Sequence, residues 1–139
     1  MRTQWPRRTA AFYAAMATFH WGDLSCNDPG WVYAVQKQET PLVKIGFTKS
    51  PDVYDRIKTL RCPTREMLTL TGAVWIRQHV PKIEHYIHWL LRGSRVEGEW
   101  FAVAMNQVIL EALATQAQEA LNAHIAHAWC QPRRVVRIA

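Results

Sequence analysis

The chain has 139 residues, 49% of them hydrophobic, and carries a formal net charge of +6. This length and apolar content suit one folded domain with extensions and exclude a chain that is disordered throughout. The basic excess lies mostly in residues 31–103, with 11 Lys and Arg against 7 Asp and Glu, which fits either a polyanionic partner such as nucleic acid or a mildly basic soluble protein.

The N-terminal part of the chain predicts a basic arm followed by a helix. Residues 1–8 are polar and basic, and Phe12, Met16 and Phe19 then recur at helical spacing, which predicts an amphipathic helix over residues 9–20. This segment is too short and too polar at its end to span a membrane, and we find no signal peptide. The turn-forming segment CNDPG follows it.

The middle of the chain alternates strand-like and helix-like segments. In chain order we expect strands at residues 31–36 and 42–48, a helix at 52–60, a strand at 67–76, a helix at 81–92, and a short strand or packed segment in WFAV at 100–103. Pro81 suits the first position of its helix. This order predicts a small α+β domain with a three-stranded antiparallel sheet, flanked by N- and C-terminal helices.

The C-terminal part predicts one long helix over residues 104–128, followed by a basic tail. Leu110, Leu113, Ala117 and Leu121 share an apolar stripe on this helix. Either the stripe packs on the back of the sheet, or it pairs with a second copy of the chain. The small residues in the stripe permit close helix approach, so we lean towards a homodimer through this helix.

The number and spacing of the cysteines indicate the redox environment of the protein. Cys26, Cys62 and Cys130 are odd in number and form no Cys-x-x-Cys pair, so we expect no disulfide framework and a reducing, cytoplasmic setting. The expected organisation has three parts: an N-terminal arm and helix (1–29), a central domain (30–103), and a C-terminal helix with its basic tail (104–139).

Ordered short motifs lie in the central domain. WVYAV contains Tyr33, VKIGFT contains KIG at 44–46, and the later part carries EHYIH at 84–88 and GEWF at 98–101, with Arg56 between the second and third motifs. No single motif is specific, but the ordered set resembles the GIY-YIG endonuclease superfamily. Within it, the chain is most similar to the meiotically-up-regulated-gene and phage-type branch.

The resemblance implies a metal-dependent endonuclease that hydrolyses the phosphodiester bonds of DNA. In the resembled family a single Glu holds one Mg²⁺, so Glu84 is expected to bind Mg²⁺ or Mn²⁺. The implied catalytic set is Tyr33, Lys44, Arg56, Glu84 and His88, with Lys44 where a tyrosine is usual. The alternative is a module without catalytic activity that binds DNA or a protein partner, and a protein partner could also supply specificity to an enzyme.

The two charged residues on the expected helices suit this chemistry, although each also has an ordinary structural explanation. Arg56 offers a planar fork of donors that matches a phosphate, but an arginine at a core edge can simply cover apolar surface. Glu84 lies between Ile83 and Ile87, close to the buried face of its helix. A lone helical glutamate is otherwise a solvated surface residue.

Three other candidates leave alternatives open. Tyr33 could fill the core, or contact the attacking water as the resemblance implies, but its phenol has a reference pKa of about 10 and needs a cationic neighbour to act as a base. Lys44, on the paired strand, could be that neighbour, could take the proton itself, or could hold a phosphate as a fixed charge. His88 could relay a proton near neutral pH or be an ordinary helix histidine.

The expected nucleic-acid contacts are the basic side chains around the second strand and the first central helix, namely Lys44, Lys49, Arg56, Lys58 and Arg61. No reading helix of known type is recognised, so we expect weak, salt-sensitive DNA binding without sequence preference. Gly46 would permit close packing or close approach of a substrate.

Overall fold

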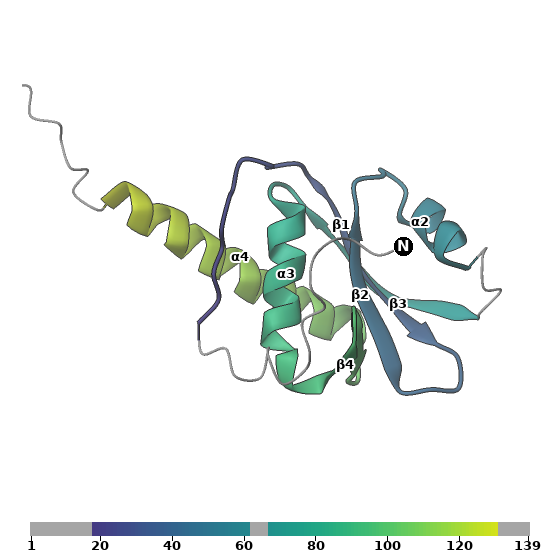
Figure 1. The fold of residues 1–139 in the computed structure, drawn as a ribbon. Helices are drawn as coiled ribbons and strands as arrows, with labels where there is room; N and C mark the ends of the chain where they lie inside the picture. The colour runs from purple at the N-terminus through teal and green to yellow at the C-terminus, as the bar shows by residue number, and fades with distance from the viewer. Residues whose placement is uncertain (1–17, 62–66, 131–139) are drawn as a thin grey trace, which may run out of the picture.

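The computed structural model describes residues 18–61 and 67–130, which form three α-helices and a five-stranded antiparallel sheet (Figure 1). In chain order the elements are β1 (Gly30–Lys37), β2 (Leu42–Thr48), α2 (Val53–Arg61), β3 (Leu68–Ile76), α3 (Val80–Leu90), the short 3-10 helix η1 (Arg92–Ser94), β4 (Arg95–Glu97), β5 (Trp100–Ala102) and α4 (Gln107–Cys130). The expected α+β class and the order of the central elements are confirmed.

The sheet is larger than the sequence predicts. Its strand order is β3-β1-β2-β5-β4, so the expectation of three strands was wrong. β5 pairs antiparallel with the start of β2, where Val43 lies opposite Phe101, and β4 pairs with β5. β5 lies in WFAV, where a short strand or packed segment was expected, whereas β4 was not expected, and each has only three residues. A three-residue strand is too short for an alternating apolar pattern to identify it.

The two faces of the sheet pack against different helices. On one face, residues such as Val32 join Ile83 of α3 and residues of α4 in the main core. On the other face, Tyr33 joins Ile57 of α2 in a smaller core. Figure 1 shows α2 on one side of the strands and α3 with α4 on the other. Successive residues of β1 point to opposite faces, so this strand contributes to both cores.

The apolar stripe of α4 is covered by the chain's own core. Leu110, Ala117 and Leu121 are buried as part of the main core, with Ala114 beside them and Leu113 only partly buried. The helix contacts β3 and α3. Of the two arrangements that the stripe permits, packing within the chain is the one observed, and a homodimer through this helix is not shown.

Both long helices of the main core begin at positions that apolar spacing alone does not predict. The side-chain Oδ1 of Asn106 accepts the backbone N–H of Ile109 at 2.8 Å, so α4 begins three residues later than expected. α3 begins at Val80, one residue before Pro81, and ends at Leu90, two residues before the expected end.

The expected N-terminal helix over residues 9–20 lies mostly outside the described residues, and its described part, residues 18–20, is not helical. Trp21 instead stacks on Tyr86 of α3, with ring centroids 5.1 Å apart. The basic arm and the basic tail lie outside the described residues, and the three-part division stays a prediction. Within the described ranges, no helix combines the length and apolar character needed to cross a membrane.

Candidate active site on the sheet and its edge

Tyr33 and Arg56 meet on the α2 face of the sheet. Tyr33 lies in the middle of β1 and is fully buried, and the Nε–H of Arg56 donates a hydrogen bond to its phenol oxygen at 3.3 Å. Gly46 is the antiparallel partner of Tyr33 on β2, and a Cβ added to it would lie 2.5 Å from the phenol oxygen. The glycine is therefore required because the tyrosine side chain lies directly over it.

The environment of Tyr33 keeps its phenol protonated. Burial raises the pKa of Tyr33 above its ordinary value, while the hydrogen bond and the charge of Arg56 act in the opposite direction without overcoming it. The charges of Glu99 and Glu84 raise this pKa further. The cation in contact with the phenol is thus Arg56 rather than Lys44. Because the phenol oxygen accepts from Arg56, its own hydrogen is available to a substrate oxygen.

Lys44 forms an ion pair with Glu99. The Lys44 Nζ lies 2.9 Å from Glu99 Oε1, and the side chains are 18% and 44% exposed. The ammonium group also lies 5.8 Å from the ring centroid of Trp100. Sequence reasoning gave Glu99 no role, although it lies within the GEWF motif. The pairing of β5 with β2 brings it to Lys44, and this pairing was not visible in the sequence.

Glu84 is a buried carboxyl on α3 with an unsatisfied oxygen. Its residue is 1% exposed, and its Oε2 has no hydrogen-bond partner among the described residues. Burial raises the pKa of Glu84 well above its ordinary value, the charge of Glu99 raises it further, and the charge of Lys44 lowers it. The Nε2 atoms of His85 and His88 lie 3.6 and 3.7 Å from the carboxyl oxygens, beyond good hydrogen-bond distance.

His88 joins α3 to the sheet. Its Nε2 lies 2.8 Å from the carbonyl oxygen of Ile45, and a carbonyl can only accept, so Nε2 carries the hydrogen. Burial lowers the pKa of His88 to about 4. The ring is therefore neutral near neutral pH and holds α3 against β2 at the level of Glu84.

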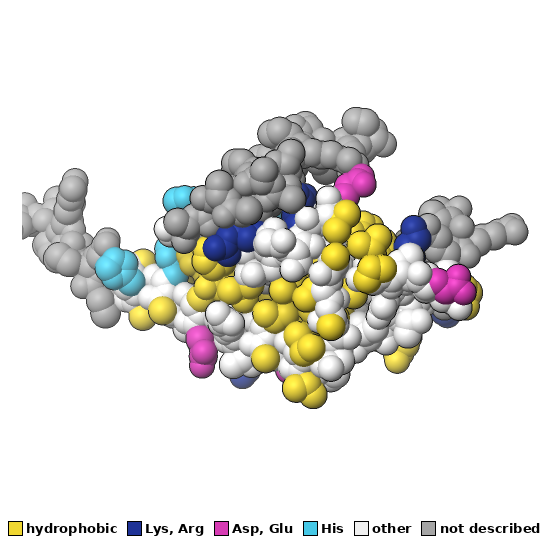
Figure 2. Space-filling model, turned by 90° about the horizontal axis from the view of Figure 1, so that it is seen from below, with side chains coloured by type: hydrophobic (Ala, Val, Ile, Leu, Met, Phe, Trp, Pro, Cys, Tyr) yellow, Lys and Arg dark blue, Asp and Glu magenta, His cyan; other side chains and the backbone are white. Residues whose placement is uncertain are grey.

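The outer basic residues are more scattered. Lys49 pairs with Asp28 at 2.8 Å, and Lys58 is exposed on α2. Arg61 ends α2, and its side chain is outside the described part of the chain. On the face drawn in Figure 2, hydrophobic side chains gather along the middle and the visible Lys and Arg lie toward its margins. Among the described atoms this face carries no continuous basic stripe.

Within the described residues, the donors around Glu84 are too few to hold a metal ion through protein ligands alone. No group of three or more His, Cys, Asp or Glu side chains that could hold a metal is found among residues 18–61 and 67–130. The unsatisfied Oε2 of Glu84 is one free oxygen ligand. Mg²⁺ keeps several of its waters and binds proteins through one or two carboxylates, so one carboxylate can be its protein ligand only where water also reaches the ion.

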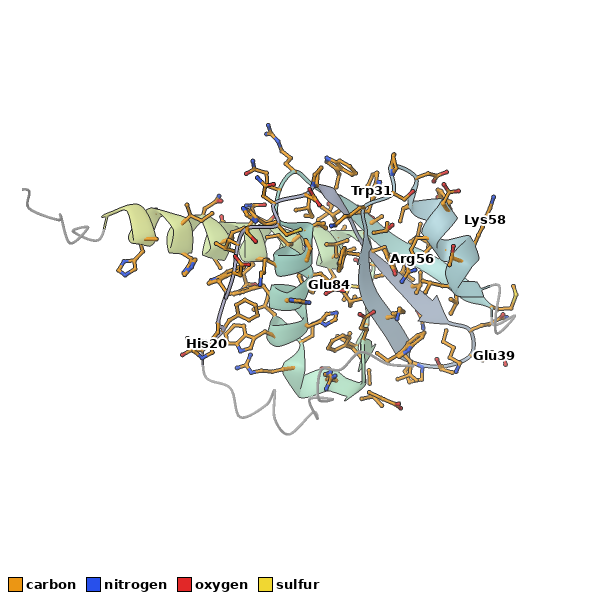
Figure 3. All side chains as sticks on the ribbon, turned by 45° about the horizontal axis from the view of Figure 1, so that its top comes forward. His20, Trp31, Glu39, Arg56, Lys58 and Glu84 are labelled. Carbon is orange, nitrogen blue, oxygen red and sulfur yellow. The ribbon has the colours of Figure 1, made fainter. Side chains whose placement is uncertain are left out.

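The elements of the site come from both sides of β2. Arg56 projects from α2, and Glu84 from α3, as Figure 3 shows. A family model, that of the T5orf172 domain, matches residues 30–117, more than half of the chain. The chain belongs to the T5orf172 domain family. This membership is consistent with a function on nucleic acid. No match to a curated protein or to a solved structure was found.

The family match corrects the assignment expected from the motifs. The sequence motifs predict membership of the GIY-YIG endonuclease superfamily, whereas the model that matches is that of the T5orf172 domain. The expectation rested on short motifs that are individually unspecific, while the T5orf172 match runs continuously from β1 into α4. The roles of the site residues therefore depend on their own geometry and chemistry.

Proposed function

We propose that this T5orf172 domain protein is a metal-dependent endonuclease that hydrolyses phosphodiester bonds of DNA. The family match supports a function on nucleic acid. The chemistry is inferred from Tyr33 and Arg56 on the α2 face of the sheet, from Lys44 on β2, and from Glu84 on α3, whose charge acts on Tyr33. A reducing cytoplasm suits the free thiol of exposed Cys26.

The observation that carries the proposal is the unsatisfied carboxyl of Glu84. A buried polar atom without a partner costs free energy, so a folded protein rarely retains one without a function. Lys44 and Glu99 are near enough for their charges to act on this carboxyl. A raised pKa together with nearby charged partners is typical of functional sites.

Arg56 is proposed to bind the phosphate whose ester bond is broken. Its Nε is engaged with Tyr33, which orients the guanidinium and leaves the two terminal nitrogens for phosphate oxygens. The Tyr33 hydroxyl would donate its hydrogen to the same phosphate or to the attacking water. Such preorganised donors stabilise the charge that develops in the transition state.

Lys44 is proposed to act as a fixed positive charge. Of the three roles that the sequence leaves open, this one agrees best with its ion pair to Glu99, because the pair orients the ammonium group. The Glu99 side chain is 44% exposed, so its carboxyl would also be able to orient water beside Lys44.

Glu84 would hold the Mg²⁺ or Mn²⁺ ion, which when bound neutralises phosphate charge and assists the leaving oxygen. Binding a cation requires the carboxyl to lose its proton, so cation affinity should rise with pH. His88 would keep Glu84 in place through its hydrogen bond to the backbone of β2.

A module that binds DNA without cleaving it is the second candidate. It is favoured by the complete burial of Glu84, because a neutral, buried carboxyl can persist without a cation. In this reading Lys44 and Arg56 contact phosphate but no bond is broken.

Incubation of supercoiled plasmid with the purified protein and Mg²⁺ or Mn²⁺ tests the proposal. We expect nicked or linear DNA with the wild type, no product with a chelator, and no product with Glu84→Ala. Cleavage by Glu84→Ala at the wild-type rate would show that the metal site is elsewhere. Binding of plasmid without cleavage by the wild type under all metals would favour the binding module.

A further inference from the structure

A shallow depression of about 440 Å³ lies on the protein surface beside the start of α2. Trp31 of β1 and Tyr54 of α2 line it, together with Pro51, Asp52, Val53, Leu70, Thr71, Gly72, Ala73 and Gln107. It opens between α2 and β3, at the outer edge of the sheet. None of the residues assigned to the proposed catalytic site lines it.

The depression is continuous with the Tyr33–Arg56 pair. Trp31 and Tyr33 are two residues apart on β1, so they share a face and lie about 6.6 Å apart along the strand. Val53 and Arg56 are three residues apart on α2 and therefore lie on the same side of the helix. β1 thus contributes Trp31 to the depression and Tyr33 to the pair, and α2 contributes Val53 and Tyr54 to the depression and Arg56 to the pair. Trp31 and Arg56 are labelled in Figure 3.

The lining suits a flat, uncharged ring. The Nε1–H of Trp31 donates to the carbonyl of Pro51 at 3.0 Å, which fixes the indole, and Trp75 contacts it edge-on with ring centroids 5.3 Å apart. Tyr54 is 61% exposed, although large aromatic side chains usually bury their rings. The Tyr54 ring therefore remains available to a ligand that stacks, beside the partly buried indole of Trp31.

The charged and polar part of the lining argues against a phosphate in the same place. Asp52 contributes a carboxylate, which would repel an anion but can accept a hydrogen bond from a ring N–H or an amino group. The side-chain amide of Gln107 is already bonded to both the N–H and the carbonyl of Ala73. A phosphate therefore fits at Arg56, and an aromatic base fits in the depression next to it.

We propose that this depression binds one nucleobase of the strand whose phosphate lies at Arg56. The base leaves its stack in the nucleic acid and stacks on Trp31 and Tyr54, as bases do on aromatic residues of single-strand binding proteins. This inference rests on the proposed function for the position of the phosphate. It adds that single-stranded or frayed nucleic acid is the preferred ligand.

Binding without catalysis tests the inference. Fluorescence anisotropy, in the presence of a chelator, compares a labelled oligothymidylate with a strand of the same length and charge in which every nucleotide lacks its base. The expected result is at least about tenfold tighter binding of the strand with bases. Tyr54→Ala should reduce the ratio of these two affinities several-fold. Val96→Ala, an exposed apolar residue on β4, is the matched control and should leave it unchanged.

Each outcome bears on the inference. The inference is overturned if the wild type binds the strand with bases and the strand without bases equally tightly. It is also overturned if Tyr54→Ala has a normal melting temperature and the same ratio of the two affinities as the wild type. If the ratio behaves as expected but no plasmid is cut, the base site stands and the proposed hydrolysis fails. If plasmid is cut but the ratio is near one, only the base site fails.

Discussion

Arg56 on α2 donates a hydrogen bond to the phenol oxygen of Tyr33 on β1, directly above Gly46 on β2. Three consecutive elements of the chain thus constrain one another's side chains. The glycine makes space for the phenol, the phenol orients the guanidinium, and the guanidinium partly offsets the cost of burying a hydroxyl.

Replacement of Arg56 should lower the rate of cleavage. Arg56→Ala removes the proposed phosphate ligand, so we expect cleavage of plasmid to slow by about two to three orders of magnitude, as loss of a charge-stabilising donor does. Arg56→Lys should restore little of the lost cleavage rate, because an ammonium group does not reproduce the planar fork of donors. Lys58→Ala, on the exposed part of the same helix, is the control and should change the rate at saturating DNA little. Full rescue by lysine would mean that Arg56 supplies only a general positive charge.

Gly46→Ala should destabilise the fold. The added Cβ would lie 2.5 Å from the Tyr33 phenol oxygen and 2.7 Å from the ring carbon that bears it, so either the ring or the strand must move. We expect a loss of about 1 to 3 kcal/mol in the free energy of unfolding, measured by urea denaturation. Gly93→Ala is the matched control, since its Cβ would contact nothing within 4 Å. Equal losses in the two variants would contradict the close contact.

Glu84→Gln should raise stability in the absence of divalent cations. The folded state retains a proton on Glu84 that the unfolded state releases above its ordinary pKa of 4.5, so wild-type stability falls as pH rises from 4.5 towards the raised pKa. Gln carries no such proton and avoids this loss. The melting temperature of the variant should therefore exceed that of the wild type near neutral pH, and the difference should shrink as the pH approaches 4.5.

The same pair of proteins tests the metal site without an activity assay. Added Mg²⁺ or Mn²⁺ should raise the melting temperature of the wild type and leave that of Glu84→Gln unchanged, because a ligand stabilises only the state that binds it. Equal shifts in both proteins would place the cation away from Glu84.

His88 should make the fold sensitive to acid. Its pKa is lowered from 6.5 to about 4, so the unfolded state binds a proton between these values that the folded state does not. The stability conferred by the neutral ring is complete above 6.5 and is lost as pH falls towards 4, by about 3 kcal/mol in all. The titration of Glu84 changes the stability in the opposite direction over part of this pH range. The effect of His88 should therefore be measured in the Glu84→Gln variant. Denaturation at a series of pH values in that variant should show the decline, and a flat profile would contradict it.

Binding of duplex DNA should be weak and depend strongly on salt. Phosphate contacts release counterions, so the logarithm of the binding constant should fall linearly with the logarithm of salt concentration. Lys58→Ala should reduce this slope by about one if Lys58 contacts a phosphate. Anisotropy titrations at several salt concentrations measure both effects. A flat salt response would favour a protein partner over DNA.

Local patterns in the sequence were sufficient to predict the order and type of the central elements. Short apolar runs in WVYAVQ and LVKIGFT indicate β1 and β2, and the helical recurrence of Val53 and Ile57 indicates α2. The resemblance carried by the short motifs, rather than these periods, singled out Tyr33, Arg56 and Glu84 as candidate site residues, and their roles stay predictions. The motifs did not identify the family correctly, since short motifs carry less information than the continuous match over residues 30–117.

Tertiary structure alone decided the partners of those residues. A short strand or packed segment was expected at 100–103, but β4 and β5 are too short to show a period. Neither the five-stranded sheet nor the approach of Glu99 to Lys44 could therefore be predicted. An apolar stripe predicts that one face of a helix is buried, but it does not identify what covers that face. Only the structure shows that the stripe of α4 packs in the chain's own core. The burial of Glu84, which sets its pKa and leaves one of its oxygens without a partner, likewise depends on how α3 packs against β2.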